Sequence, residues 1–293
     1  MIDKLEVLQV AKKLGLQNST IEKDYVLGWV LMGIQNHSKI RNSWVFKGGT
    51  CLKKCFFDEY RFSEDLDFTL LDAAQMNEFF LMGVLKELAE WVYDEVGIEI
   101  PLKSLSVEFH TNLQSSLSAQ AKLSYIGPLK QKKINSLPTI KLDLTPHEKV
   151  VLIPENREIF HSYSDRPLNS PKAFCYGYEE IFAEKLRALA ERARPRDLYD
   201  IIHLYQQRHR LKEKIKFFES LEQKCSFKKM PLPRLKTIEQ HPQKAILSSE
   251  WENMLRHQLP MLKPFEVFWE QLPHIFDWLY EDHPEVSGIE RDS

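Results

Sequence analysis

The chain has 293 residues, of which 43% are hydrophobic and 28% are charged, and both shares are close to those of globular proteins. With 10 Gly and 15 Pro, the composition excludes a collagen-like, linker-like or generally disordered protein. The formal net charge of −2 argues neither for nor against a nucleic-acid partner. At about 150 residues per domain, the length predicts two domains.

The start of the chain and the cysteines indicate the compartment. Charged and apolar residues alternate over residues 1–6, which is not the apolar core of a signal peptide. The longest early uncharged stretch, residues 25–38, is too short to span a bilayer. The four cysteines include no C-x-x-C pair and are typical of reduced thiols: Cys51, Cys55, Cys175 and Cys225. We therefore expect a cytoplasmic protein with no membrane partner.

The first half of the chain mixes helical and strand patterns. Residues 20–36 predict an amphipathic helix with Thr20 as its N-cap. The apolar run 44–46 predicts a strand that ends at two glycines, and residues 50–57 predict a helix directly after them. A strand is expected at 65–70, a long helix at 76–96, and three further strands at 105–112, 120–126 and 139–145.

After about Asp165 the strand patterns fade and helical patterns predominate. Helices are expected at 179–192, 196–207, 211–222 and 265–281, and the tail from about residue 286 has the composition of a disordered segment. The sequence thus predicts an α+β domain at 1–165, followed by a mostly helical C-terminal domain at 166–293.

Two carboxylates, Asp65 and Asp67, form the first candidate site. Residues two apart on a strand point to the same face, so both carboxylates project together while Leu66 and Phe68 face the core. Hard oxygen ligands of this kind suit Mg²⁺, which completes its shell with water and substrate phosphates. Exposed strand edges also carry such pairs, so the pair alone leaves both interpretations open.

The turn Lys47-Gly48-Gly49-Thr50 favours a phosphate site beside these carboxylates. Glycines allow backbone N–H groups to approach phosphate oxygens, and the N-terminus of the following helix adds a positive dipole. A third carboxylate, Asp143, lies on the polar face of the strand at 139–145 and joins the pair if the two strands are neighbours. A solvated strand residue is the alternative for Asp143.

Two further candidates come from the helical half. Lys185 lies in the middle of an apolar helix stripe, so it either extends to the surface or points into a cleft with an anionic partner. Asp197 follows Pro195 in the first turn of the next helix, where the helix dipole alone favours a carboxylate.

Five motifs, in this order, resemble those of the AbiEii/AbiGii toxin family, which includes the MenT toxins. They are E-K-D-Y (22–25), F-K-G-G-T (46–50), R-F-S-E-D-L-D-F (61–68), A-E-K-L-R-A-L (183–189) and R-D-L-Y-D (196–200). Any one of them is weak, whereas the ordered set is specific. The family belongs to the DNA polymerase β-type nucleotidyltransferase superfamily. The resemblance therefore implies a nucleotidyltransferase-type mixed sheet with flanking helices in the first domain.

The resemblance also implies roles for individual residues. The implied metal ligands, for two Mg²⁺ ions, are Asp65, Asp67 and, with a looser match, Asp143. The implied nucleotide-binding residues are Gly48, Gly49, Thr50, Arg61, Ser63, Lys185 and Arg196, of which the two arginines are lesser candidates. Asp197 matches the acidic residue of the family's last motif and is counted with Lys185 and the three metal ligands as catalytic.

The activity that the resemblance implies is transfer of a nucleoside monophosphate from an NTP to an acceptor hydroxyl, with release of pyrophosphate. Asp143 would also accept the hydroxyl proton. The protein would be the toxin of an AbiE-type toxin–antitoxin system with a cognate antitoxin. Transfer RNA 3′ ends are the acceptor that the resemblance suggests for some members.

The charge distribution bears on an RNA partner. Residues 205–236 contain ten Lys and Arg against three Glu, and residues 250–293 contain ten Asp and Glu against three Lys and Arg. The basic stretch is a candidate surface for the phosphates of RNA. Two solvated helix faces that attract each other would explain the same distribution.

Other functions remain open at this stage. The same core would serve a small-molecule or protein acceptor. A non-catalytic scaffold would keep the fold, although it has no need of the D-x-D pair, the glycine turn or a lysine in an apolar stripe. A metal-dependent phosphohydrolase needs similar carboxylates, but the ten His residues are scattered along the chain.

Overall fold

The computed structural model describes residues 1–111, 117–131, 136–169 and 171–281, so the predicted tail lies outside the described residues. The chain divides into two compact units. The first comprises Met1–Tyr176 together with His257–Pro260, and the second comprises Gly177–Arg256 together with Met261–Ser293. The first unit thus extends beyond residue 165, because it includes a strand at Lys172–Cys175 that the sequence pattern does not predict.

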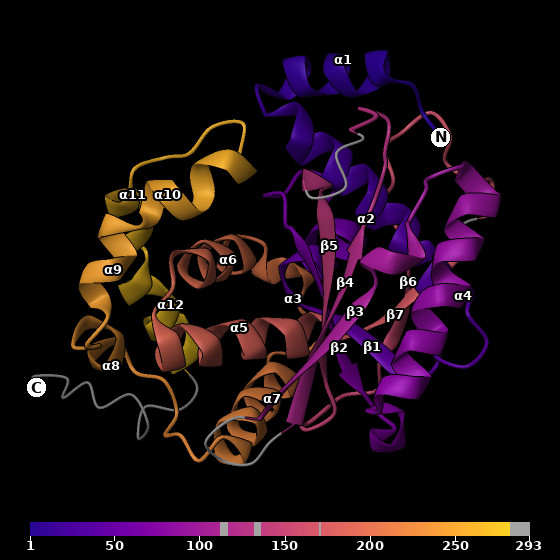
Figure 1. Ribbon diagram of the computed structural model, residues 1–293. Coiled ribbons are helices and arrows are strands. Elements are labelled where there is room, and N and C mark those ends of the chain that lie inside the picture. Colours follow the sequence, from indigo (N-terminus) through magenta and orange to yellow (C-terminus); the bar gives the residue numbers. More distant parts are fainter. Residues whose placement is uncertain (112–116, 132–135, 170, 282–293) are drawn as a thin grey trace, which may run out of the picture. The chain divides into compact units, whose positions relative to one another are not determined.

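A seven-stranded mixed sheet in the order β3-β4-β5-β2-β1-β7-β6 forms the centre of the first unit (Figure 1). β1 pairs antiparallel with β2, and β2 pairs in parallel with β5, so the two strands that carry the candidate carboxylates are neighbours. The strand bounds are β1 Trp44–Lys47, β2 Asp65–Leu70, β3 Ser106–Thr111, β4 Leu117–Ser124, β5 Thr139–Thr145, β6 Glu155–Glu158 and β7 Lys172–Cys175.

One face of the central strands is apolar and builds the core. Leu66 and Phe68 on β2 and Ile140 and Leu142 on β5 are all 0% exposed, as the period of two predicts. The aspartates of the same strands lie on the opposite face and are half-buried. The alternation therefore leaves a polar row on the sheet without disturbing the core.

The helices of the first unit differ from prediction at two points. α2 begins at Asn18 after Gln17, so Thr20 is not its N-cap, and Ile21–Gln35 are buried except for Lys23. α2 contacts α1, α4 and strands of the sheet, and it is buried on all sides rather than amphipathic. The helix after the glycines begins at the glycines themselves and continues as one π-helical turn. The bounds are α1 Lys4–Leu14, α2 Asn18–Asn36, α3 Gly48–Cys51, π-turn η1 Leu52–Phe56, 3₁₀ turns η2 Ala73–Gln75 and η3 Leu102–Ser104, and α4 Glu78–Val96.

The second unit is helical over its described residues. Its core includes a ring cluster in which Phe182 lies 4.7 Å from Phe217 and 5.9 Å from Trp278, measured between ring centroids. The helix expected at 265–281 is in fact two helices, because Pro273 occupies the first turn of the second one, a position that begins a helix. The bounds are α5 Tyr178–Arg192, α6 Pro195–Gln206, η5 Arg208–Arg210, α7 Lys214–Phe227, α8 Leu235–Glu239, α9 Lys244–Ser249, α10 Trp251–Leu255, η6 Arg256–Gln258, α11 Phe265–Trp269 and α12 Leu272–Leu279.

No helix in the described part of the chain combines the length and apolar character that crossing a membrane requires.

Candidate active site

A row of four polar side chains crosses the centre of the sheet. Strand register places Lys47 of β1 opposite Asp67 of β2, Asp67 opposite Asp143 of β5, and Asp143 opposite Gln120 of β4. Neighbouring strands lie about 4.8 Å apart, so the carboxylates of Asp67 and Asp143 are adjacent. The Gln120 side-chain amide donates a hydrogen bond of 2.9 Å to Asp143 Oδ1 and fixes the orientation of that carboxylate. Lys47 forms an ion pair with Glu148.

The glycine turn lies directly against the Asp67 carboxylate. Gly48 has a φ of +79°, a left-handed conformation that side chains other than glycine rarely adopt. A Cβ atom at Gly48 would lie 2.0 Å from Asp67 Oδ2, so any side chain there would displace the carboxylate. The first backbone unit of α3 therefore touches a candidate metal ligand.

The second glycine accommodates the next motif in the same way. A Cβ atom at Gly49 would lie 2.6 Å from a guanidinium nitrogen of Arg61 and 3.3 Å from Ser63 Oγ. The Thr50 hydroxyl donates a hydrogen bond to the backbone oxygen of Asp65. The structure thus brings together the turn residues, Arg61 and Ser63.

Arg61 is held from a distant part of the sequence. It is 2% exposed, and its guanidinium donates a hydrogen bond of 2.9 Å to Gln258 Oε1. The backbone N–H of Phe62 donates to the Gln258 carbonyl at 2.8 Å. Residues 257–260 return to the first unit and support the segment just before β2, a role that no sequence motif signals.

Asp65 lies in a strongly charged environment. Burial raises the pKa of Asp65 and the charges of Asp143 and Glu64 raise it further, whereas Lys23 and Lys141 act in the opposite direction. The net effect is a pKa above the usual value, which means that the fold without a bound cation resists full ionisation here. A divalent cation would relieve this repulsion.

A cavity of about 430 Å³ adjoins the start of β2. Its walls include Lys23, Ser63, Glu64, Tyr125, Thr139 and His257. Glu64 is fixed there by His257, at 3.0 Å, and by Lys23, at 3.6 Å. The volume lies in the range of small-molecule sites.

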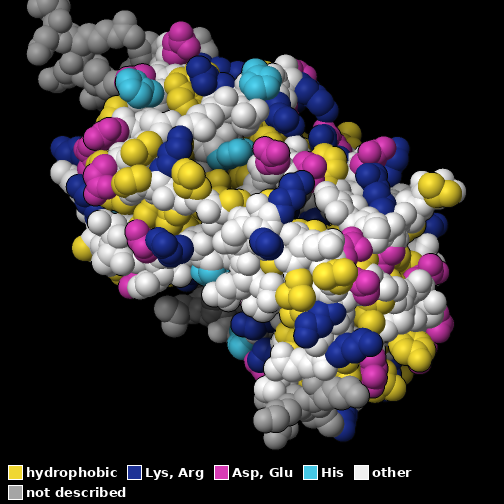
Figure 2. Space-filling view, turned by 90° about the horizontal axis from the view of Figure 1, so that it is seen from above, with side chains coloured by type: hydrophobic (Ala, Val, Ile, Leu, Met, Phe, Trp, Pro, Cys, Tyr) yellow, Lys and Arg dark blue, Asp and Glu magenta, His cyan; other side chains and the backbone are white. Residues whose placement is uncertain are grey.

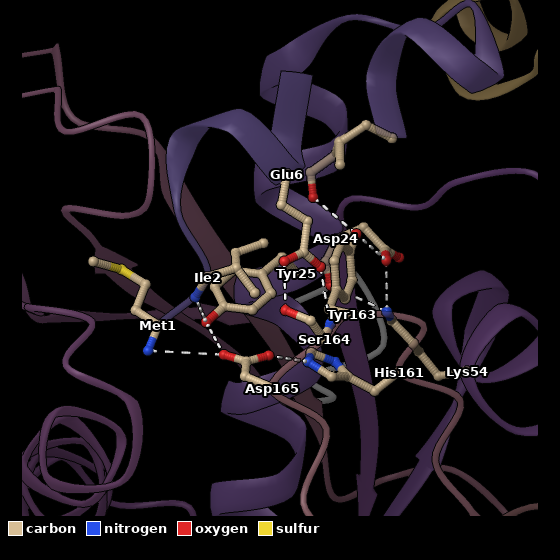
Figure 3. Close-up of polar contacts among 11 residues, drawn as sticks. Met1, Ile2, Glu6, Asp24, Tyr25, Lys54, His161, Tyr163, Ser164 and Asp165 are labelled. Atoms are coloured by element: carbon tan, nitrogen blue, oxygen red, sulfur yellow. Dashed lines mark hydrogen bonds and ion pairs between the residues drawn. The ribbon is translucent and has the colours of Figure 1, made fainter. Parts of the chain in front are cut away.

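The E-K-D-Y motif positions the helix that follows the turn. Asp24 Oδ2 accepts a hydrogen bond of 2.7 Å from Lys54 Nζ and one of 3.0 Å from the Tyr163 hydroxyl (Figure 3). The Tyr25 hydroxyl donates to Asp165 Oδ2 at 2.7 Å, beside the buried His161. Because Lys54 lies in η1, the buried pair connects α2 to the segment that begins at Gly48.

Lys185 and Asp197 belong to the second unit, where they lie together. Lys185 is 8% exposed, and its Nζ lies 2.7 Å from Asp200 Oδ2 and 3.9 Å from Asp197 Oδ1. The lysine in the apolar stripe therefore has anionic partners rather than extending to the surface. Arg192 donates two hydrogen bonds, of 2.7 and 2.8 Å, to the Asp197 carboxylate. Arg196 is half-buried on α6.

A strand, a glycine turn that starts a helix and a neighbouring strand with two carboxylates form the arrangement that the sequence motifs predict for a nucleotidyltransferase. Residues 29–281 match the family model described as nucleotidyl transferase AbiEii toxin, type IV toxin–antitoxin system. This match covers most of the chain, so the chain belongs to the AbiEii family of nucleotidyltransferase toxins. A toxin of such a system implies an antitoxin as partner and an NTP as substrate. The family is one of enzymes, which disfavours the scaffold and phosphohydrolase alternatives.

The fold also has a counterpart among solved structures. The chain is similar to MenT4, a nucleotidyltransferase toxin from Mycobacterium tuberculosis H37Rv, with a TM-score of 0.55 and 17% sequence identity. The similarity covers 96% of this chain and 99% of that chain. No curated protein sequence matches the chain. The predicted family and the predicted α+β, nucleotidyltransferase-type fold are confirmed.

Proposed function

We propose that the chain transfers a nucleoside monophosphate from an NTP to an acceptor hydroxyl in a Mg²⁺-dependent reaction. The observation that carries this proposal is the contact between the Gly48 turn and Asp67, with Asp143 adjacent in register. The arrangement places backbone N–H groups suited to phosphate beside carboxylates suited to a divalent cation.

The residues present fit Mg²⁺. Asp65, Asp67 and Asp143 supply hard oxygen ligands on one face of two adjacent strands. Burial and the nearby Asp143 carboxylate raise the pKa of Asp65, so its charged form is disfavoured in the folded chain. A bound cation would offset this cost of ionisation. When bound, Mg²⁺ neutralises charge on the triphosphate and orients the attacking hydroxyl.

The chain's own residues perform the remaining tasks. The N–H groups at the start of α3 bind phosphate oxygens, and the absence of a side chain at Gly48 allows their close approach. Asp143, held by Gln120, accepts the proton of the acceptor hydroxyl. The motif resemblance assigns Lys185 to the nucleotide phosphates, and within the second unit Asp197 and Asp200 orient its ammonium group. The cavity beside Ser63 and Glu64 receives the nucleoside.

We propose tRNA as the acceptor, with the basic stretch at 205–236 as its binding surface. Figure 2 shows Lys and Arg side chains mixed with Asp and Glu over the face it presents, with no large patch of one charge on that face. Within the stretch, Lys224 is buried in ion pairs with Glu180 and Glu184. Lys228 and Lys229 are half-buried and exposed, respectively, and are available to phosphates.

Label transfer from each of the four α-³²P NTPs to total bacterial tRNA tests the proposal. We expect labelled RNA with one or two nucleotides, lost in Asp65→Ala and retained in Asp94→Ala, which removes an exposed carboxylate on α4. Label on a protein or a small hydroxylated compound alone would favour the other acceptors. No transfer to any acceptor would contradict the proposed reaction.

A further inference from the structure

Three buried cysteines form a cluster next to the segment that follows the glycine turn. Cys51, Cys55 and Cys175 have Sγ atoms that all lie within 4.8 Å of one another. The three thiols are free and are 0%, 2% and 0% exposed, respectively. Among the described residues, this is the one group in which three ligand atoms of His, Cys, Asp or Glu come so close.

The fold brings these residues together from three elements. Cys51 ends α3, and Cys55 lies one turn later in η1. Cys175 ends β7, which pairs in parallel with β1 at Phe46. The cluster is therefore fixed by the strand before the glycine turn and by the helix after it.

The number and spacing of the sulfur atoms select the kind of ion. Thiolates are soft ligands that favour Cu(I), Zn²⁺ and iron–sulfur clusters, and structural Zn²⁺ takes four ligands. Three sulfur atoms at about 2.3 Å from a central ion lie about 4 Å from one another. Movements of under about 1 Å from the present spacing would suffice to close a three-coordinate site.

A cationic side chain, the guanidinium of Arg157, lies beside the cluster. Arg157 is fixed by a hydrogen bond of 3.0 Å from its Nε to the Cys55 carbonyl. Cu(I) with three thiolates has a net charge of −2, which a nearby guanidinium partly offsets.

Cys225 is a buried free cysteine outside the cluster and serves for comparison. It is 2% exposed and lies on α7. It is not a member of the one group of three close ligand atoms found in the described part of the chain. Equal burial with a different environment makes it a matched control.

We propose that Cys51, Cys55 and Cys175 form a binding site for one Cu(I) ion. Binding forms three Cu–S bonds, releases the remaining thiol protons to solvent and leaves the oxidation state of the ion unchanged. Because Cys51 directly follows Thr50, occupancy also stiffens the glycine turn; that consequence rests on the proposed function, whereas ion binding does not.

Anaerobic competition with a chromophoric Cu(I) chelator, bathocuproine disulfonate, tests the site without any nucleotide. We expect the full chain to withhold one equivalent of Cu(I), and Cys175→Ser to lower the affinity at least 100-fold, whereas Cys225→Ser leaves it unchanged. Cys55→Ser provides a second variant if Cys175→Ser fails to fold, as judged by circular dichroism. The proposal is overturned if the wild type withholds no Cu(I), if Cys225→Ser loses the ion, or if both cluster variants fold and bind as the wild type does.

Discussion

Gly48 and Asp67 are in van der Waals contact across the junction between β1 and β2, and a single added carbon at Gly48 would lie 2.0 Å from Asp67 Oδ2. The contact joins the two halves of the proposed chemistry, because one residue belongs to the phosphate turn and the other to the metal site. A substitution at Gly48 should therefore disturb both the phosphate turn and the metal site.

Gly48→Ala should lower nucleotide transfer at least about 100-fold, because displacement of a reacting group by about 1 Å costs a factor of that size. The positive φ adds about 1 kcal/mol of backbone strain. Gly83→Ala is the control: nothing lies within 4 Å of its Cβ position on α4, so the variant should gain about 0.5–1 kcal/mol and keep full activity. Initial rates and melting temperatures measure both. Unchanged transfer in folded Gly48→Ala would contradict the role of the turn.

Asp65→Asn should stabilise the metal-free protein at pH 7. Burial and the Asp143 carboxylate raise the pKa of Asp65 in the folded chain. A group with a raised folded pKa favours folding fully below its unfolded pKa, and this contribution is lost as the pH rises through the folded value. At neutral pH the charge therefore disfavours folding, and each 1 kcal/mol regained raises Tm by about 2–4 °C.

Differential scanning fluorimetry in EDTA measures this effect. Mg²⁺ should then raise the Tm of the wild type but not that of Asp65→Asn, and the exposed Asp94→Asn should behave as the wild type. A lower Tm for Asp65→Asn in EDTA would show that Asp65 is a structural carboxylate rather than a ligand kept under repulsion.

Lys54→Met should destabilise the chain by about 3–5 kcal/mol, because it leaves Asp24 buried without its cation. Lys39→Met, which removes an exposed pair with Glu87 at a similar distance of 2.8 Å, should cost less than about 1 kcal/mol. Denaturation followed by Trp fluorescence compares the two. Equal losses would show that the Asp24–Lys54 pair has no special structural role.

The Asp24–Lys54 pair also predicts a pH dependence. Burial acts to raise the pKa of Asp24, but Lys54 and Lys53 outweigh it and hold the pKa below its usual value. The stabilisation is therefore present above the unfolded pKa and is lost as the pH falls through the folded value. The difference in unfolding free energy between wild type and Lys54→Met should narrow as the pH falls below about 4. A constant difference would contradict this account of the pair.

Lys185→Met separates the two roles of that lysine. The variant leaves the fully buried Asp200 without its ammonium partner and should cost about 3–5 kcal/mol. The double variant Lys185→Met/Asp200→Leu should recover most of this stability but not the transfer activity, if Lys185 contacts the nucleotide. Recovery of both stability and transfer activity would show that Lys185 stabilises the fold and does not contact the nucleotide.

The double variant Lys228→Glu/Lys229→Glu should weaken tRNA binding at low salt by about 10-fold. The slope of log affinity against log salt concentration should also fall, by the amount expected for the loss of about two phosphate contacts. The same charge change at Lys86 and Lys103, two exposed residues outside the basic stretch, is the control. Filter binding from low to high salt measures both. Affinity that responds neither to salt nor to these variants would remove the basic stretch from the proposal.

The two strands that carry the candidate carboxylates are predictable because their signal is local. The alternation over 65–70 and 139–145 matches β2 and β5, and it places Asp65, Asp67 and Asp143 on one face. Their adjacency depends on strand order, which no local pattern contains. Gln120 lies on a predicted strand, but its hydrogen bond to Asp143 depends on that order too.

Features that rest on tertiary contacts are the ones that prediction missed. β6 and β7 are four-residue strands with no clear alternation, and β7 is defined by its pairing with β1 on one side and β6 on the other. Gln258 supports Arg61 from a distance of almost 200 residues. Lys185 signals a buried anionic partner through its position in the apolar stripe, but the leading partner, Asp200, becomes visible only in the structure.

Isothermal titration with a non-hydrolysable α,β-methylene NTP, with and without Mg²⁺, tests the central claim most directly because it needs no acceptor. The account predicts binding that requires Mg²⁺, is lost in Asp67→Asn and persists in Asp94→Asn. Binding of equal strength without Mg²⁺, or in Asp67→Asn, would contradict the assignment of Asp65, Asp67 and Asp143 as the metal ligands of a nucleotide site.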